Sequence, residues 1–495
     1  MNEREVNMQE QTAQNKQAGL EFERVFTTDD VSPYDMFEYE TRTSTIRNPD
    51  GSVVREMDNV EVPKHWSQMA TDILAQKYFR KKGVPLKDEN GRPLRNDDGT
   101  IKKGSEHSMK QVAHRMALCW KDWGAEHNYF KTEDDANIFY DELVYMLLNQ
   151  SGSPNSPQWF NTGLNTAYGI TGNAQGHYYV DALTGEVKKS QDAYSRPQPH
   201  ACFIQRVEDD LVNDGGIFDL VQREARLFKY GSGTGSNFSP IRGKGEPLSG
   251  GGSSSGLMSF LKVFDAGAGA IKSGGTTRRA AKMVCLDLDH PEIEDFINLK
   301  VREEQKVAAL VAGSQNCKPK LERVMEAAKE GTDVSDNTEL RRAVKDALQA
   351  EVPLNYIYRT IQLVEQGVER LDFVDLDSGY ESEAYETVTG QNANNSVRIP
   401  NEFFNALDQG NEWHLINRTD GDVYKTVDSE QLWDDIVYAA WMCADPGVQY
   451  DSTINEWHTC PKDGPINGSN PCSEYMFLDD TACNLASINL VKYRS

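Results

Sequence analysis

The chain contains 495 residues, which at about 150 residues per domain allows two to four domains. Its 52 basic and 77 acidic residues give a formal net charge of −25, which argues against nucleic acid or an anionic membrane as the main partner. No apolar run approaches the roughly 18 residues of a membrane span. The first residues, MNEREVNMQEQTAQNKQ, lack the apolar run of a secretory signal, so residues 1–20 are interpreted as a disordered tail. We expect a globular, cytoplasmic protein.

Helical patterns dominate the stretch from residue 21 to 150. Apolar residues recur at helical spacing in 63–83, 109–123 and 134–149. Between the first two patterns, Asn90-Gly91 and Asp98-Gly99 favour tight turns and predict a surface hairpin. We expect a helical amino-terminal domain over 21–150.

From residue 151 onward, strand and helix patterns alternate. Residues 199–207 and 282–288 predict strands, and residues 216–229 and 257–272 predict helices. Such alternation favours an α/β architecture with parallel strands. Charged helical segments interrupt it at about 301–390, where we expect a helical insertion.

Glycine is concentrated between residues 230 and 275, which hold 13 of the 38 glycines. Bare amide groups in such loops suit phosphate oxygens, and Lys272, Arg278, Arg279 and Lys282 make the second loop locally basic. The segment matches neither familiar phosphate motif, so a glycine-rich linker remains the alternative to an anion-binding loop.

Two groups of side chains could bind a metal ion. Asp287, Asp289 and His290 are possible hard-metal ligands, but they precede Pro291 and a predicted helix, so we interpret them as capping residues. The other group could hold zinc, although its spacing is irregular and contains no C-x-x-C pair. Its members are His458, Cys460, Cys472 and Cys483. We expect no metal site.

The segment NPCSEY places Asn470, Cys472 and Glu474 on alternate positions. In an extended strand, all three side chains would project from one face. A thiol, a carboxylate and an amide together form a catalytic grouping with a reactive sulfur, a base and a hydrogen-bonding group. The eight cysteines are too few for a disulfide scaffold.

The sequence resembles the catalytic subunit of ribonucleotide reductase, most closely its adenosylcobalamin-dependent class. The resemblance spans most of the chain. The motifs that carry it are NSPQWFN, AQGHYYVD, PHACFIQ, FKYGSGTGSNFSPIRGKGEPLSGGGSSSGLMSFLKVFD, IKSGGTTRRAAKMVCLDLDHP, NNSV, CADPGVQYDSTINEWHTCP, NPCSEY and CNLASINL.

The resemblance implies a ten-stranded α/β barrel over 151–495 with a finger loop that carries the radical cysteine. It makes Cys472 the thiyl-radical cysteine, Glu474 the base for the 3′ hydroxyl and Asn470 the amide that holds the hydroxyls. Cys202 and Cys483 correspond to the redox pair that reduces the 2′ carbon and becomes a disulfide. The implied activity is reduction of ribonucleotides, of diphosphates rather than triphosphates, for DNA precursor synthesis.

The same resemblance assigns binding residues and partners. Substrate contacts fall on Ser156, Ala201, Cys202 and Gly233. The resemblance implies that the deoxynucleotide effector binds to Asp209, Lys229 and Arg242. It further implies a loop that passes the identity of the effector to the substrate site, with the residues Gly274, Gly275, Arg278 and Arg279. It also implies adenosylcobalamin, a thioredoxin-like reductant and a homodimer.

The chain departs from the family at its carboxy-terminal end. It stops at Ser495, whereas the family continues through the rest of the barrel. A fragment, a split enzyme with a separate carboxy-terminal polypeptide, and a gene interrupted by an intein are all compatible with this. The alternative function is therefore an amino-terminal piece that binds nucleotide but is inactive without its partner.

Overall fold

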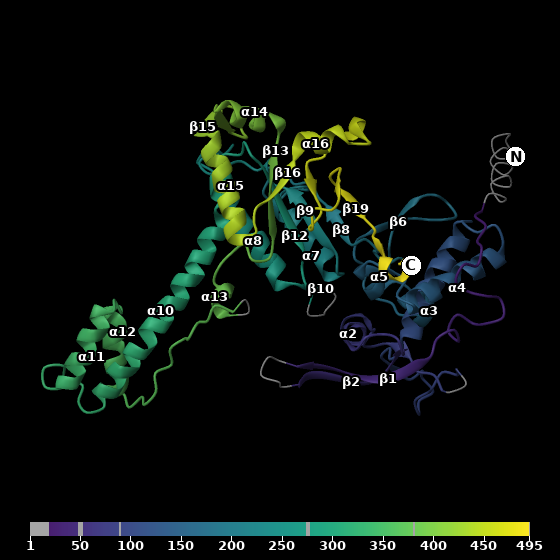
Figure 1. The fold of residues 1–495 in the computed structure, drawn as a ribbon, viewed down its shortest axis with the longest axis horizontal. Coiled ribbons are helices and arrows are strands. Elements are labelled where there is room, and N and C mark those ends of the chain that lie inside the picture. Colours follow the sequence, from purple (N-terminus) through teal and green to yellow (C-terminus); the bar gives the residue numbers. More distant parts are fainter. Residues whose placement is uncertain (1–18, 48–52, 89–90, 274–277, 380–381, 495) are drawn as a thin grey trace.

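The computed structural model describes residues 19–47, 53–88, 91–273, 278–379 and 382–494. Figure 1 shows a central sheet with an amino-terminal domain on one side and a long helical arm on the other. Most of the predicted tail, residues 1–18, lies outside the described residues. Within the described ranges, no helix is both long and apolar enough to cross a bilayer.

The amino-terminal domain combines helices with a β hairpin. Ser108 and Thr132 each form a capping box that starts a helix, which explains why sequence patterns located both helices well. The elements are β1 (Tyr39–Arg47), β2 (Val53–Pro63), α2 (Gln68–Ile73), the π turn η2 (Leu74–Tyr78), β3 (Val84–Pro85), β4 (Lys103–Gly104), α3 (Met109–Glu126) and α4 (Glu133–Leu148). Besides the expected helices, the domain contains the antiparallel hairpin of β1 and β2, which was not predicted.

One six-stranded sheet forms the centre of the molecule, in the order β16-β13-β12-β9-β8-β19. All neighbouring strands run parallel except β8 and β19, which are antiparallel. The bounds are β8 (Cys202–Ile204), β9 (Gly233–Asn237), β12 (Lys282–Asp287), β13 (Asn394–Ile399), β16 (Gly447–Tyr450) and β19 (Thr481–Cys483). The described sheet does not close on itself, since β16 and β19 are its two edges.

Helices connect the parallel strands and cover the sheet. The connecting helices are α7 (Ile217–Lys229), α8 (Leu257–Ala270), α9 (Ile293–Ile297), α14 (Asn401–Gln409) and α15 (Ser429–Cys443). Their apolar faces meet the sheet in a core that includes Leu220, Phe264, Leu286 and Ile436. Burial on both faces explains why β12 has an almost unbroken apolar sequence instead of an alternating one.

The predicted insertion corresponds to a helical arm with its own core. It consists of α10 (Leu299–Ala328), α11 (Thr338–Gln349), α12 (Leu354–Glu365) and the short α13 (Glu383–Glu386). Leu321, Leu340 and Ile357 pack together in a cluster separate from that of the sheet. Figure 1 shows α11 and α12 at the end of α10 that is remote from the sheet.

Short elements complete the fold. They are β5 (Gly152–Pro154), α5 (Ser156–Asn161), α6 (Leu164–Tyr168), β6 (Tyr178–Val180), β7 (Val187–Lys189), β10 (Lys272–Ser273), β11 (Arg278–Arg279), β14 (Glu412–Ile416), β15 (Val423–Asp428), α16 (Asp451–Glu456), η3 (Pro461–Asp463), β17 (Gly468–Ser469), β18 (Met476–Phe477), β20 (Ala486–Ile488) and η4 (Leu490–Tyr493). The hairpin of β17 and β18 carries Cys472 at its tip and is called the finger hairpin below.

Candidate active site

Cys202 and Cys483 lie directly opposite each other where β8 pairs with β19. Opposed residues of an antiparallel pair have Cβ atoms about 4.5–5.5 Å apart. A disulfide requires Cα atoms about 4.4–6.8 Å apart, so a modest adjustment would join the two sulfurs. Both cysteines are reduced and buried in the structure. The two cysteines that the resemblance implies as a redox pair therefore lie on neighbouring strands.

The glycine-rich strand β9 lets the finger hairpin approach the sheet. A Cβ atom on Gly233 would lie 2.6 Å from Cγ of Pro471, and one on Gly235 would lie 1.9 Å from the carbonyl oxygen of Ser469. Gly233 also pairs with Cys202 in the parallel ladder. These two glycines belong to a buried strand, so at their positions neither the anion-binding loop nor the linker interpretation holds.

The tip of the finger hairpin is a tight turn, so the expectation of an extended NPCSEY segment is wrong. The Oδ1 atom of Asn470 accepts hydrogen bonds from the backbone N–H groups of Glu474 at 3.1 Å and Tyr475 at 3.0 Å. Ser473 has a φ of 62°, in the left-handed region. Asn470 is buried, whereas Cys472 and Glu474 are exposed. The alternate positions of Asn470, Cys472 and Glu474 therefore do not place their side chains on one face of a strand, although the turn keeps the three residues together.

Burial raises the pKa of the Cys202 thiol to about 12, and burial also raises the pKa of Cys483. The Glu474 carboxylate adds to both increases, which places it near both sulfurs. The Asn470 amide, beside the Cys202 sulfur, lowers the pKa of that thiol in part. Both thiols therefore stay protonated near neutral pH, as hydrogen donors rather than as thiolate nucleophiles.

Asn470 provides a buried donor that faces this group of side chains. Its Nδ2 atom makes no hydrogen bond of normal geometry within the described part of the chain. The Cys202 sulfur beside it is only a weak acceptor, so this buried donor is suited to binding a ligand hydroxyl.

The predicted substrate residues border the two thiols. The Ala201 N–H group donates to the carbonyl oxygen of Cys483 at 3.0 Å, and the Ala201 carbonyl accepts from the N–H group of Gly233 at 2.7 Å. Ser156 is the first residue of α5, and its hydroxyl lies 3.1 Å from the hydroxyl of Tyr78. The Asn155 N–H group donates to the carbonyl of Leu485 at 2.9 Å, which holds α5 beside the strand that follows Cys483.

The predicted effector residues do not all come together. Arg242 Nε and Asp209 Oδ2 form an ion pair at 2.6 Å. Lys229 is the last residue of α7, a 13-residue helix about 20 Å long whose first turn lies near Asp210. Gly274 and Gly275 lie outside the described residues, and Arg278 and Arg279 form strand β11, which pairs with β10.

Neither metal hypothesis gains support. No group of three or more His, Cys, Asp or Glu side chains with metal-binding geometry occurs among the residues that the structure describes. The capping interpretation holds only for His290, whose Nδ1 atom accepts from the N–H group of Glu292, the residue before α9, at 3.1 Å. Asp289 instead pairs with Arg418 at 2.5 Å.

The sequence is similar to two known protein families and to named proteins. The family described as "Ribonucleotide reductase, barrel domain" matches residues 200–495, and the family described as "Class II vitamin B12-dependent ribonucleotide reductase" matches residues 40–150. Vitamin B12-dependent ribonucleotide reductases from Bradyrhizobium diazoefficiens and Agrobacterium fabrum each match 96% of this chain, with 55% sequence identity over the matched region. A vitamin B12-dependent ribonucleoside-diphosphate reductase from Mycobacterium tuberculosis is 25% identical over 86% of it.

The chain spans 40% of the Bradyrhizobium protein and 39% of the Agrobacterium protein. The barrel-domain match contains the six-stranded sheet, both buried thiols and the finger hairpin, and the class II match covers most of the amino-terminal domain. The chain therefore belongs to the ribonucleotide reductases, in their class II, vitamin B12-dependent branch.

Proposed function

We propose that this chain supplies the radical cysteine and the redox pair of an enzyme that reduces ribonucleoside diphosphates to 2′-deoxyribonucleotides. One observation carries the proposal: Cys202 lies opposite Cys483, with the Asn470 amide and the Glu474 carboxylate beside the same sulfurs. This arrangement combines two reducing thiols, a base and a hydroxyl-binding donor at one place.

The reaction balances with these groups. Cys472, as a thiyl radical, takes the hydrogen atom from the 3′ carbon, and Glu474 accepts the proton of the 3′ hydroxyl while Asn470 holds the hydroxyl. The 2′ hydroxyl takes up a proton and leaves as water. Cys202 and Cys483 supply two electrons and two protons, one proton for the leaving water and one for the 2′ carbon, and become a disulfide. Glu474 returns its proton to the 3′ oxygen, and Cys472 returns its hydrogen to the 3′ carbon.

The exposure of Cys472 fits a cofactor that must reach the sulfur from outside the protein. Adenosylcobalamin, when bound, supplies the organic radical that removes the hydrogen atom from a thiol. The buried pair is less accessible, which keeps radical formation at Cys472 and reduction at Cys202 and Cys483 on separate sulfurs.

Substrate and effector are proposed from family membership together with the local contacts. Ala201 and Gly233 adjoin the two thiols, and Ser156 begins the helix held next to Leu485; together with Cys202 these residues would contact the nucleotide. Two relatives are named as reductases of ribonucleoside diphosphates, which favours that substrate class. Asp209 and Arg242 would contact a deoxynucleotide effector, with Lys229 joining them only if a second copy of the chain brings it there.

A complete enzyme would contain a closed ten-stranded barrel and use a thioredoxin-like reductant. The open edges of β16 and β19 could each accept a further strand. This observation favours the second candidate function, in which the chain binds nucleotide but turns over only with a polypeptide that supplies the remaining strands.

Turnover tests the proposal. The chain is mixed with a polypeptide that supplies the carboxy-terminal part of a relative, adenosylcobalamin, a dithiol and a ribonucleoside diphosphate. We expect deoxyribonucleotide from the native chain and none from Cys472→Ala, with nucleotide affinity unchanged, because the sulfur abstracts hydrogen and does not bind substrate. Activity in Cys472→Ala would refute the assignment of the radical residue.

A further inference from the structure

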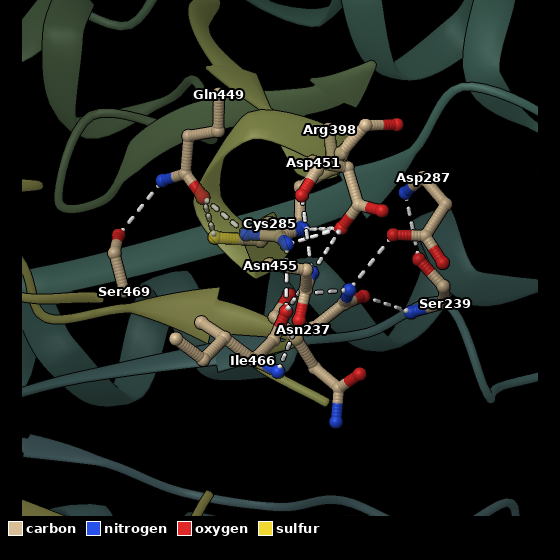
Figure 2. A network of polar contacts seen from close by, with 12 residues as sticks. Asn237, Ser239, Cys285, Asp287, Arg398, Gln449, Asp451, Asn455, Ile466 and Ser469 are labelled. Atoms are coloured by element: carbon tan, nitrogen blue, oxygen red, sulfur yellow. Dashed lines mark hydrogen bonds and ion pairs between the residues drawn. The ribbon is translucent and has the colours of Figure 1, made fainter. Parts of the chain in front are cut away.

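A buried polar network connects the sheet to the finger hairpin. Figure 2 shows it, with Arg398 of β13 and Gln449 of β16 between the acidic Asp451 and the hairpin residue Ser469. Arg398 and Gln449 are 1% and 2% exposed. Neither side chain belongs to the thiol pair, the base or the predicted nucleotide contacts, so the reaction described above leaves the network without a role.

Arg398 is fixed on several sides. Its Nε atom donates to Oδ1 of Asp451 at 3.0 Å, its Nη2 atom to the carbonyl of Ile466 at 2.7 Å, and its Nη1 atom to Oε1 of Gln449 at 3.2 Å. Ile466 lies just before the finger hairpin, and its N–H group donates to Oδ1 of Asn455 at 2.9 Å. The network therefore holds the chain at the point where it enters the hairpin.

Arg398 also decides which way the Gln449 amide points. Arginine has only donors, so the amide oxygen must face it and the amide nitrogen must face away. The Nε2 atom of Gln449 donates to the hydroxyls of Ser469 and Ser473, both at 2.8 Å. Those two serines lie on either side of Cys472 in the sequence.

The serines carry the contacts onward to the hairpin tip. The Ser469 hydroxyl donates to the carbonyl of Asn470 at 3.1 Å. Ser473 is held in a left-handed conformation, which costs a non-glycine residue free energy unless its surroundings compensate. The hydrogen bond from Gln449 supplies such compensation.

We propose that Gln449 is a positioning residue for the radical cysteine: its amide, oriented by Arg398, fixes the turn that presents Cys472. This inference rests on the proposed function, since positioning matters only if Cys472 reacts. Gln449 contacts the thiol of Cys285, whose sulfur lies 3.8 Å from Oε1, and it acts on Cys472 through Ser469 and Ser473.

Hydrogen exchange of this chain tests the positioning directly, without turnover. The amides of Glu474 and Tyr475 are protected by Asn470, so they report on the turn. Gln449→Leu removes both serine contacts and should speed their exchange at least about tenfold, the effect of losing one or two ordinary hydrogen bonds. Val448→Ala, the neighbour on the same strand with its side chain on the opposite face, is the matched control and should leave both rates unchanged.

If Gln449→Leu fails to fold, Gln449→Glu is the second variant that tests the positioning role. It keeps the volume and the contact with Arg398, but a carboxylate cannot donate, so Ser469 must turn its hydrogen away from Asn470. We expect faster exchange of the same two amides. Native protection in the Gln449 variants, or equal loss in Val448→Ala, would overturn the inference.

The complemented enzyme supplies the second readout. Gln449→Leu should lower kcat at least about tenfold with KM unchanged, because the variant misplaces the sulfur without touching the nucleotide. An equal rise in KM would contradict positioning and indicate a substrate-binding role. Failure of the native enzyme to turn over would refute the proposed function but leave the exchange result intact.

Discussion

At the scale of single residues, Gly235 determines how closely the finger hairpin can lie against the sheet. Gly235→Ala would place a methyl group 1.9 Å from the Ser469 carbonyl oxygen and 3.1 Å from the Cβ atom of Met283, and neither atom can move without its backbone. We expect a loss of about 1–3 kcal/mol in unfolding free energy, measured by chemical denaturation, as for other overpacked sites.

Gly267→Ala is the matched control. Gly267 lies within α8, and an added methyl group would meet no atom within 4 Å. Alanine is favoured over glycine in helices, so this variant should gain about 0.5–1 kcal/mol. If the two variants behaved alike, the close approach of hairpin and sheet would be wrong.

The sequence indicated which residues matter at this scale but not how they meet. Cys202 and Cys483 are far apart in the chain, and only the family resemblance predicted their pairing. The fixed spacing of Asn470, Cys472 and Glu474 suggested one face of a strand, yet Asn470 bonds the backbone of Glu474 and bends the chain into a turn. No sequence pattern indicated a role for Gln449, because its hydrogen-bond partners come from other segments of the chain.

At the scale of elements, the connection between β12 and α9 depends on His290. Its Nε2 atom donates to the carbonyl of Ile241 at 2.8 Å, and its Nδ1 atom accepts from the N–H group of Glu292 at 3.1 Å. The ring is therefore neutral, and burial lowers the pKa of His290 to about 4.

This depressed pKa predicts acid sensitivity. The native state disfavours the charged ring. The neutral ring therefore contributes fully to the free energy of unfolding above the ordinary histidine pKa of about 6.5, and this contribution is lost as the pH falls toward 4. We expect the native chain to lose about 3 kcal/mol of unfolding free energy from this group between pH 7 and pH 4. His290→Asn should show a shallower decline in denaturation experiments over that range, and parallel curves would contradict the assignment.

Elements with local start signals were predictable. Apolar periodicity placed the starts of α3 and α4 to within a residue, and the structure shows a capping box at Ser108 and at Thr132 where these helices begin. The hairpin of β1 and β2 was not predicted, because the residues of its two strands alternate only weakly between apolar and polar. Its stability comes from packing: Val60 and Val62 are buried against Met109 and Leu148 of the helical core.

At the scale of the whole molecule, the helical arm and the sheet have separate cores. Leu321→Ala opens a cavity in the arm, and Leu286→Ala opens one beneath the sheet. Each substitution should cost about 2–5 kcal/mol of local stability. Hydrogen exchange of the β12 amides should accelerate in Leu286→Ala and stay native in Leu321→Ala. Acceleration in both variants would show that the two cores unfold together.

The alternation of strand and helix patterns predicted the parallel sheet, and the change to charged helices located the arm. The antiparallel entry of β19 could not be predicted in this way, since strand direction depends on connections that cross the whole domain. That reversal is what brings Cys483 to Cys202.

In the proposed reaction, Cys202 and Cys483 reduce the ribonucleotide. The most direct test is a single turnover of the complemented enzyme without external reductant, followed by peptide mapping of its disulfides. We predict one Cys202–Cys483 disulfide for each deoxyribonucleotide formed, with Cys472 recovered as a free thiol. Product formation with both cysteines still reduced, or with Cys472 in the disulfide, would contradict the account.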